Sequence, residues 1–190
     1  IQQGYGMTEC SPVISISQRW NIRSDSVGQL VPNCQAKTVD GELWVKGSSV
    51  MQGYYKMPQE TAETLEDGWL KTGDLGYVDE EGFVYLTGRK KNLIITKNGE
   101  NVSPEELENA LSGNRLVGEV LVREKGGVIE AEIYPDQDYV KKKRVKDVRA
   151  ALQEVIDEYN RTAAPQKKIY SLVVRDKEFE KTTTRKIKRF

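Results

Sequence analysis

Three polar segments of this sequence combine glycine with charged or hydroxyl side chains, a combination that suits ligand binding better than a core. The first is GYGMTE at residues 4–9, where the glycines permit a tight turn and a close approach of the backbone to a ligand. Tyr5 offers a flat aromatic face, Thr8 a hydroxyl group, and Glu9 a carboxylate of the kind that Mg²⁺ prefers. Taken alone, however, so short a segment fits an ordinary surface turn better than a site.

The other two polar segments lie further along the chain. In GWLKTGDLGYVD (68–79), Asp74 stands between Gly73 and Leu75, and a carboxylate held by such a turn can accept two ribose hydroxyls. Alone, this segment fits an Asp-capped turn. The third segment is EKTTTRKIKRF (180–190), which by itself fits a frayed basic terminus.

The composition excludes several classes of function. The sequence has no histidine, which excludes Ser-His-Asp and Cys-His catalysis and every histidine-based metal site. Lys+Arg and Asp+Glu both number 29, so no net charge attracts nucleic acid or an anionic membrane. Cys10 and Cys34 form neither a disulfide framework nor a paired metal motif. Since no signal peptide and no apolar run of roughly 20 residues is found, we expect a cytoplasmic protein without a transmembrane segment or a nucleic-acid partner.

Residues 1–88 have the pattern of a β-rich region. Strands are predicted where short apolar runs alternate with polar residues between glycine-containing turns, at 27–31, 36–40, 41–47 and in a pair within 76–88. A short helix is predicted at 59–66. Several short strands separated by glycine turns indicate a small antiparallel barrel or sandwich subdomain.

Residues 92–190 have a different pattern, in which helices alternate with strands. A helix is predicted at 103–111, with Ser103 as its cap, Pro104 at its first position and Glu106 completing a capping box. A long helix is predicted from an apolar face that runs from Val145 to Tyr159, and the basic run KKKRVK (141–146) is interpreted as its solvated entry. The predicted strands are 93–96, 119–124, 128–134 and 169–175. The order β-α-β-β-α-β is that of the ferredoxin-like unit, and it predicts a small two-layer α+β domain that begins near Arg89–Asn92.

The order of the polar segments resembles that of the adenylate-forming superfamily. Besides GYGMTE and WLKTGDL, the segments GRKKNLIITKNGENVSPEELE (88–108) and KTTTRKIKR (181–189) match the family's motifs, so the resemblance covers nearly the whole chain. That family comprises acyl- and aryl-CoA synthetases, adenylation domains of peptide synthetases and firefly-type luciferases. The resemblance implies that residues 1–89 are the C-terminal part of a large adenylate-forming domain. It implies that residues 90–190 are a mobile C-terminal lid domain carrying a catalytic lysine.

The resemblance also implies roles in ATP binding for residues of the first half. Tyr5 would stack on adenine, Thr8 would contact the phosphates, and Glu9 would hold Mg²⁺. Asp74 would bind the ribose hydroxyls with the assistance of Arg89.

For the second half, the resemblance implies roles in movement, CoA binding and catalysis. Lys91 matches the hinge position, while Lys97 and Gly99 lie in the loop that would line the tunnel for the pantetheine arm of CoA. Lys186 matches the lysine that reaches the acyl carboxylate and the α-phosphate. Arg185 departs from the family, which usually has glycine there. Because arginine resists positive φ, we expect the tail to sit differently or Arg185 to add a phosphate contact.

The function that the resemblance implies is that of an AMP-forming fatty-acid–CoA ligase using ATP, Mg²⁺ and CoA, with a long-chain acid as the expected substrate. Adenylation joins two anions, so a positioned ammonium and Mg²⁺ are what its transition state needs. The family's phosphate loop would precede GYGMTE. The chain is therefore expected to be a fragment, inactive alone, whose partner is the rest of its own polypeptide. The alternatives are a peptide-synthetase adenylation domain and a non-catalytic interaction module. Retention of Glu9, Asp74, Arg89 and Lys186 argues against the latter.

Overall fold

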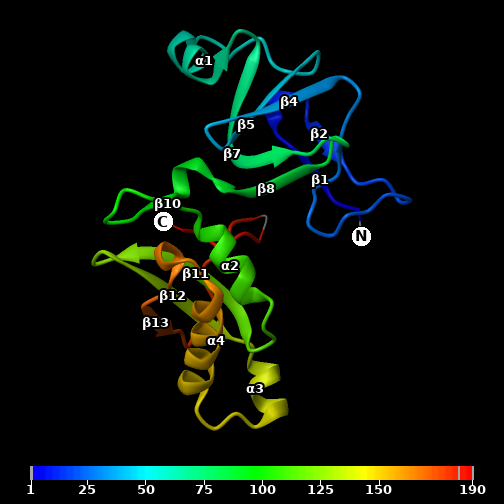
Figure 1. Ribbon diagram of the computed structural model, residues 1–190. Helices are drawn as coiled ribbons and strands as arrows, with labels where there is room; N and C mark the ends of the chain where they lie inside the picture. The colour runs from blue at the N-terminus through cyan, green and yellow to red at the C-terminus, as the bar shows by residue number, and fades with distance from the viewer. Residues whose placement is uncertain (1, 184, 190) are drawn as a thin grey trace. The chain divides into compact units, whose positions relative to one another are not determined.

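The computed structural model describes residues 2–183 and 185–189. The fold is of the α+β class, as predicted, with mainly antiparallel sheets. It consists of two compact units that divide between Lys91 and Asn92, and Figure 1 labels the elements of both. None of the helices in the described part of the chain is both long enough and apolar enough to span a membrane.

Two sheets share the core of the first unit. The smaller sheet has the order β1-β2-β3, and in the larger β4, β5, β7 and β6 follow one another while β8 also pairs with β7. The strands are β1 (Gly4–Gly6), β2 (Val13–Ile16), β3 (Gln29–Leu30), β4 (Cys34–Val39), β5 (Glu42–Gly47), β6 (Leu65–Glu66), β7 (Trp69–Val78) and β8 (Val84–Arg89). Buried Ile14, Leu43, Val45 and Leu70 belong to one cluster, which joins the two sheets. Within the described residues both sheets are open, so the subdomain is not a closed barrel.

Strand β7 is longer than the sequence pattern predicted. It begins at Trp69 rather than near Gly76, and buried positions alternate along it at Leu70, Thr72 and Asp74. Two of these buried side chains are polar, which interrupts the apolar alternation by which a strand is usually recognised. The predicted short helix is α1 (Pro58–Thr64). The 3₁₀ turn η1 (Thr8–Cys10) also belongs to this unit, and a second 3₁₀ turn, η2 (Lys90–Asn92), spans the division between the two units.

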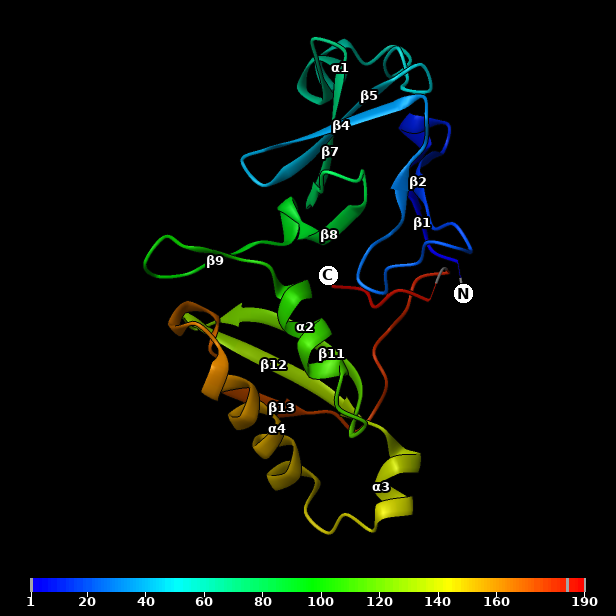
Figure 2. The ribbon, with the colours of Figure 1, turned by 45° about the vertical axis from the view of Figure 1, so that its right-hand side comes forward.

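The second unit packs helices against a three-stranded sheet. Its elements are β9 (Ile94–Ile95), β10 (Asn101–Val102), α2 (Pro104–Ser112), β11 (Val117–Lys125), β12 (Val128–Pro135), α3 (Gln137–Lys143), α4 (Val148–Thr162), η3 (Pro165–Lys167) and β13 (Ser171–Val174). Strand β12 pairs antiparallel with β11 and parallel with β13. Side chains of α2, α4 and the sheet share one buried cluster, and Figure 2 shows α4 running along the sheet. The predicted two layers are therefore confirmed.

Three details of the second unit differ from the prediction. Strand β9 pairs with β10 in a separate hairpin, so among the described residues the sheet has three strands instead of the four of a ferredoxin-like unit. The basic run 141–146 ends α3 and forms the connection to α4, whose first turn is capped instead by Asp147. The Ser103 side chain does not cap α2; its hydroxyl donates instead to Glu105 at 3.0 Å, and Glu106 of the expected capping box pairs with Lys167.

Candidate functional site

Asp74 is the centre of a polar cluster that joins three strands of the first unit. The Asp74 side chain is 7% exposed. The Tyr5 hydroxyl of β1 donates to Asp74 Oδ2 at 2.6 Å, and Arg89 Nε of β8 lies 2.6 Å from Oδ1. The register of β7 and β8 places Asp74 directly opposite Arg89. Three residues that the sequence analysis assigned to nucleotide binding therefore meet, although Tyr5 and Asp74 are 69 positions apart.

The cluster keeps Tyr5 in its neutral, hydrogen-donating form. Burial raises the pKa of the Tyr5 hydroxyl, and the hydrogen bond to the Asp74 carboxylate raises it further. A carboxylate has about four lone-pair positions, so Asp74 can accept additional hydroxyl groups beside Tyr5 and Arg89. The geometry suits a site for a polyhydroxylated ligand, which would share the carboxylate or displace Tyr5 from it.

Glu9 is held by a tyrosine that the sequence analysis did not single out. The Tyr54 hydroxyl donates to Glu9 Oε1 at 2.8 Å, and the Met51 N–H donates to the Glu9 carbonyl oxygen at 2.8 Å. Tyr54 is itself fixed by α1, because its N–H donates to Thr61 Oγ1 at 2.9 Å. Burial, followed by the contact with Glu9, raises the pKa of Tyr54. Thr8 is exposed in the same 3₁₀ turn. The sequence feature that could have drawn attention to Tyr54 is its place beside Gly53, shortly before a helix start at Pro58.

The remaining predicted residues of the connecting region and the first hairpin lie at the surface. Lys91 is exposed in η2. Lys97 and Gly99 lie in the turn between β9 and β10, where Gly99 has a φ of 78° and donates its N–H to the Thr96 carbonyl at 2.9 Å. The Lys97 side chain lies against Gly127, since a Cβ atom at Gly127 would fall 1.9 Å from Lys97 Cε.

Lys186 projects from a tight hairpin at the end of the second unit. The Thr182 N–H donates to the Lys186 carbonyl at 2.8 Å, Lys181 pairs with Ile187, and the Lys186 side chain is exposed. Arg185 has a φ of 62°. Although arginine resists positive φ, the hairpin holds Arg185 in the left-handed conformation that favours glycine; the expected shift of the tail and the phosphate contact stay predictions.

The tail is anchored rather than frayed. Arg189 contacts two carboxylates of α2, with 2.9 Å from Nη1 to Glu108 Oε1 and 3.2 Å from Nη2 to Glu105 Oε1. Lys181 pairs with Glu119 and Glu178. Burial raises the pKa of Glu108, although Arg189 and the Val122 N–H oppose this shift. These contacts fix both arms of the hairpin that carries Lys186.

Comparison with known proteins identifies the family. The model for AMP-binding enzymes matches residues 1–55, and the model for the AMP-binding enzyme C-terminal domain matches residues 91–190, more than half of the chain. The chain belongs to the AMP-binding enzyme family. The first match contains Tyr5, Thr8 and Glu9, and the second contains Lys91, Lys97, Gly99 and Lys186. Asp74 and Arg89 lie between the two matched regions.

The relatives in this family include ligases of long-chain fatty acids. Over 123 residues the chain is 45% identical to the long-chain-fatty-acid–CoA ligase FadD15 of Mycobacterium bovis. The aligned region covers 64% of this chain and 20% of the relative. It is 41% identical over 137 residues to the long-chain-fatty-acid–CoA ligase of Bacillus subtilis. That alignment covers 63% of this chain and 24% of the relative. The chain thus spans about a fifth to a quarter of these relatives.

Solved structures of AMP-binding enzymes share the fold. The O-succinylbenzoate coenzyme A synthetase of Bacillus subtilis in complex with AMP matches with a TM-score of 0.77 and 29% identity, covering 98% of this chain and 39% of that one. The ATP-bound RpMatB-BxBclM chimera B1 matches with a TM-score of 0.81 and 27% identity, covering 96% and 38%.

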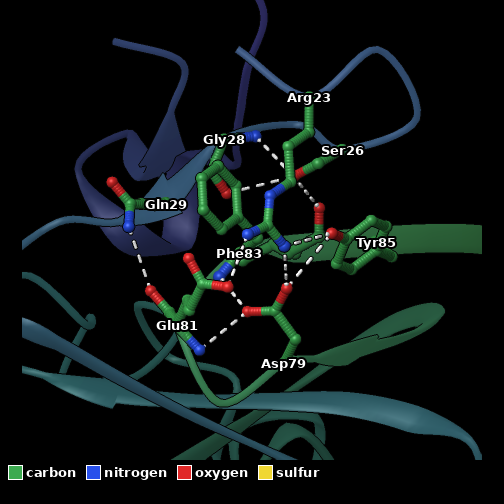
Figure 3. A network of polar contacts seen from close by, with 9 residues as sticks. Arg23, Ser26, Gly28, Gln29, Asp79, Glu81, Phe83 and Tyr85 are labelled. Atoms are coloured by element: carbon green, nitrogen blue, oxygen red, sulfur yellow. Dashed lines mark hydrogen bonds and ion pairs between the residues drawn. The ribbon is translucent and has the colours of Figure 1, made fainter. Parts of the chain in front are cut away.

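A second polar network braces the strand pair that carries Asp74 and Arg89 in this member of the AMP-binding enzyme family. Figure 3 shows Arg23 reaching into the turn between β7 and β8. Its guanidinium donates to Asp79 and Glu81 at 2.6 Å each and to the Tyr85 hydroxyl at 3.1 Å, and it lies 4.0 Å from the centre of the Phe83 ring. Arg23 therefore ties the loop after β2 to this turn, a role that the sequence analysis did not predict.

Proposed function

We propose that this chain is part of an AMP-forming acid–CoA ligase that activates a long-chain fatty acid as its acyl-adenylate and transfers the acyl group to CoA. The observation that carries the proposal is the buried Asp74 carboxylate with Tyr5 and Arg89 on it. Such a site suits the ribose of ATP, because a carboxylate accepts hydrogen bonds from vicinal hydroxyls. The long-chain substrate is supported by the names of the relatives described above.

Glu9 fits a role in Mg²⁺ binding. Within the described residues no cluster of three or more acidic, cysteine or histidine side chains forms a complete metal cage. Mg²⁺ in nucleotide sites, however, is usually held by one or two carboxylates together with phosphates and water. Bound Mg²⁺ would neutralise phosphate charge. The contribution of this chain is the Glu9 carboxylate, which Tyr54 orients, and the nearby hydroxyl of Thr8.

In the proposed first half-reaction, a carboxylate oxygen of the fatty acid attacks the α-phosphorus of ATP and pyrophosphate leaves. The Lys186 ammonium would contact both anions and stabilise the negative charge that develops between them. Its place on an anchored hairpin suits this role, because the exposed side chain is free to reach a ligand while its backbone is fixed. In the second half-reaction, the sulfur of CoA replaces AMP at the acyl carbonyl carbon.

We further propose that the two units perform different tasks. Residues 1–89 would complete the ATP-binding domain, and residues 90–190 would act as a mobile lid that pivots at Lys91 between the half-reactions. Lys97 and Gly99, in the exposed turn between β9 and β10, would then contact the pantetheine arm of CoA. The rest of the same polypeptide would supply the phosphate loop and most of the acyl pocket.

The test is an assay of the complete reading frame for exchange between ATP and pyrophosphate, with acids of graded chain length. We expect exchange with long-chain acids and, after addition of CoA, the corresponding thioester. Exchange that depends on amino acids instead would favour a peptide-synthetase adenylation domain, and no exchange with any acid would favour a non-catalytic module. The 190-residue chain alone is expected to give no exchange, and activity of the purified chain would contradict its dependence on the rest of the polypeptide.

A further inference from the structure

The buried carboxylate of Glu42 touches both of the segments that hold the Asp74–Arg89 pair. Glu42 is the first residue of β5 and is 3% exposed. Its Oε1 accepts the Gly73 N–H at 2.9 Å, and its Oε2 accepts a hydrogen bond from Lys90 Nζ at 2.9 Å. Gly73 directly precedes Asp74, and Lys90 directly follows Arg89. Glu42 therefore forms a second bridge, between the residue before Asp74 and the residue after Arg89.

The bridge at Gly73 supports an irregular part of β7. Glu42 pairs with Leu75 and Trp44 with Lys71, so Leu43 alone faces the three residues 72–74. Extra residues of this kind form a bulge, which interrupts the ladder of backbone hydrogen bonds and re-aims a side chain.

Side chains replace the interrupted backbone hydrogen bonds of the bulge. Thr72 Oγ1 donates to the Leu43 carbonyl at 2.6 Å and accepts the Asp74 N–H at 3.1 Å, while Glu42 takes the Gly73 N–H. Gly73 has a φ of 70°, a conformation that favours glycine. The direction of the Asp74 carboxylate thus depends on Glu42 as well as on Thr72.

Lys90 supplies the positive charge that balances the buried carboxylate. Burial alone would raise the pKa of Glu42, but Lys90 and the Gly73 N–H together lower it below its ordinary value. The Glu42 side chain is 5% exposed whereas the Lys90 side chain is 59% exposed, so the lysine is the partner that can leave. Its departure would leave a buried charge with only neutral donors around it, an arrangement that is strongly unfavourable.

We propose that Glu42 is a positioning residue that links nucleotide binding at Asp74 to the segment connecting the two units. Lys90 begins η2, and the division between the units lies within that turn. When Lys90 is held, the Glu42 carboxylate stays in place and supports the bulge under Asp74. Because coupling between two sites is reciprocal, a nucleotide bound at Asp74 favours the state in which Lys90 is paired with Glu42. The nucleotide half of this inference rests on the proposed function.

The first experiment needs no nucleotide. Amide hydrogen exchange at Gly73 and Asp74 is measured by NMR in the chain and in its Lys90→Met and Lys90→Arg variants. In Lys90→Met we expect exchange to be faster by about fivefold or more, the lower end of ordinary coupling between sites, because the unpaired Glu42 carboxylate turns toward water. Lys90→Arg keeps the positive charge, so in this variant exchange at Gly73 and Asp74 should be as slow as in the unmodified chain.

The matched control is Glu66→Gln, which breaks the Lys71–Glu66 pair at 2.8 Å on the same sheet without touching the bulge. It should leave exchange at Gly73 unchanged. If Lys90→Met also leaves exchange at Gly73 unchanged, the Glu42–Lys90 bridge does not support the bulge. The inference is then wrong, regardless of the result of the nucleotide-binding experiment.

The second experiment measures ATP affinity in the complete enzyme well below its melting temperature. Glu42→Gln and Lys90→Met should each weaken binding by about fivefold or more, and the double variant should be no weaker than the worse single variant, because both changes break one bridge. Losses of affinity that add up in the double variant would show that the two residues act separately. Unchanged affinity despite a lower melting temperature would show a purely structural role, and either result would overturn the linkage.

Absence of ATP binding in the unmodified enzyme would instead refute the proposed function, and the exchange experiment would still decide on the bridge. If Glu42→Gln fails to fold, the exposed Lys90 variants suffice.

Discussion

At the scale of single residues, the carboxylates proposed to contact a nucleotide and Mg²⁺ are each oriented by a tyrosine. Tyr5 donates to Asp74, and Tyr54 donates to Glu9. Groups that orient a metal ligand commonly change metal affinity by about 10- to 100-fold. The two tyrosines are therefore expected to tune ligand binding without being chemical participants.

Tyr54→Phe tests this for Glu9. The variant loses only the hydroxyl that holds Glu9 Oε1, so we expect the complete enzyme to need about tenfold more Mg²⁺ for half-maximal adenylation. The rate at saturating Mg²⁺ should change little. The neighbouring Tyr55 is 85% exposed, and Tyr55→Phe should leave the Mg²⁺ requirement as it is. Equal Mg²⁺ curves for all three proteins would remove Tyr54 from the site.

Lys186→Ala tests the proposed catalytic charge. An ammonium aimed at developing negative charge is comparable to an oxyanion-hole donor, so its loss should slow acyl-adenylate formation by about 10²- to 10³-fold. Conversion of supplied acyl-adenylate to acyl-CoA should be largely retained, because the charge acts in the first half-reaction. Lys188→Ala is the control, as its exposed side chain pairs only loosely with Glu180 at 3.6 Å. Equally mild effects of the two changes would end the assignment and turn attention to Arg185.

At the scale of elements, the terminal hairpin holds Arg185 in the left-handed region at a cost. For residues with a Cβ atom this conformation costs about 1–2 kcal/mol, which the anchoring contacts of Lys181 and Arg189 offset. The hairpin thus keeps the geometry expected of a glycine turn even though the sequence has arginine.

Arg185→Gly should therefore stabilise the hairpin by about 1 kcal/mol. Exchange of the Lys188 N–H, which donates to the Glu180 carbonyl at 2.8 Å, should slow by about fivefold, the factor that corresponds to this energy at room temperature. Arg185→Ala keeps the Cβ atom and should leave the exchange rate nearly unchanged. If both substitutions slow exchange equally, the gain comes from removing the arginine charge and the strain argument is incorrect.

At the scale of the whole molecule, each unit has its own buried cluster, around Leu43 and Leu70 in the first and around Leu107, Ile133 and Ile156 in the second. Separate cores allow each unit to fold independently. The exposed residues Lys91 and Lys97 lie at and just after the division.

Limited digestion with trypsin should first cut the chain at Lys91 or Lys97, because both side chains are exposed beside short, irregular elements. Two fragments should result, and each should retain dispersed NMR signals. Mass spectrometry of the earliest products identifies the cut. An earliest cut inside β7 or β12, with the segment from Lys91 to Lys97 intact, would contradict a two-unit molecule with an accessible connection.

Much of the fold could be predicted from local pattern. The hairpin of β11 and β12 follows from alternating apolar residues around Gly126-Gly127, and α2 and α4 follow from helical periodicity and, for α2, from Pro104 at its start. The family followed from four motifs in order. Each of these signals lies within a short stretch of chain, where backbone preference and side-chain spacing act together.

Only the tertiary structure decided which distant polar groups meet. The partners Tyr54 for Glu9 and Glu42 for Lys90 lie 45 and 48 positions away, and no local period encodes such pairs. The full extent of β7 was hidden for the same reason, because Thr72 and Asp74 are buried by partners from other strands. Buried polar residues are stable only where distant donors and acceptors satisfy them, so their pattern becomes interpretable once the chain has folded.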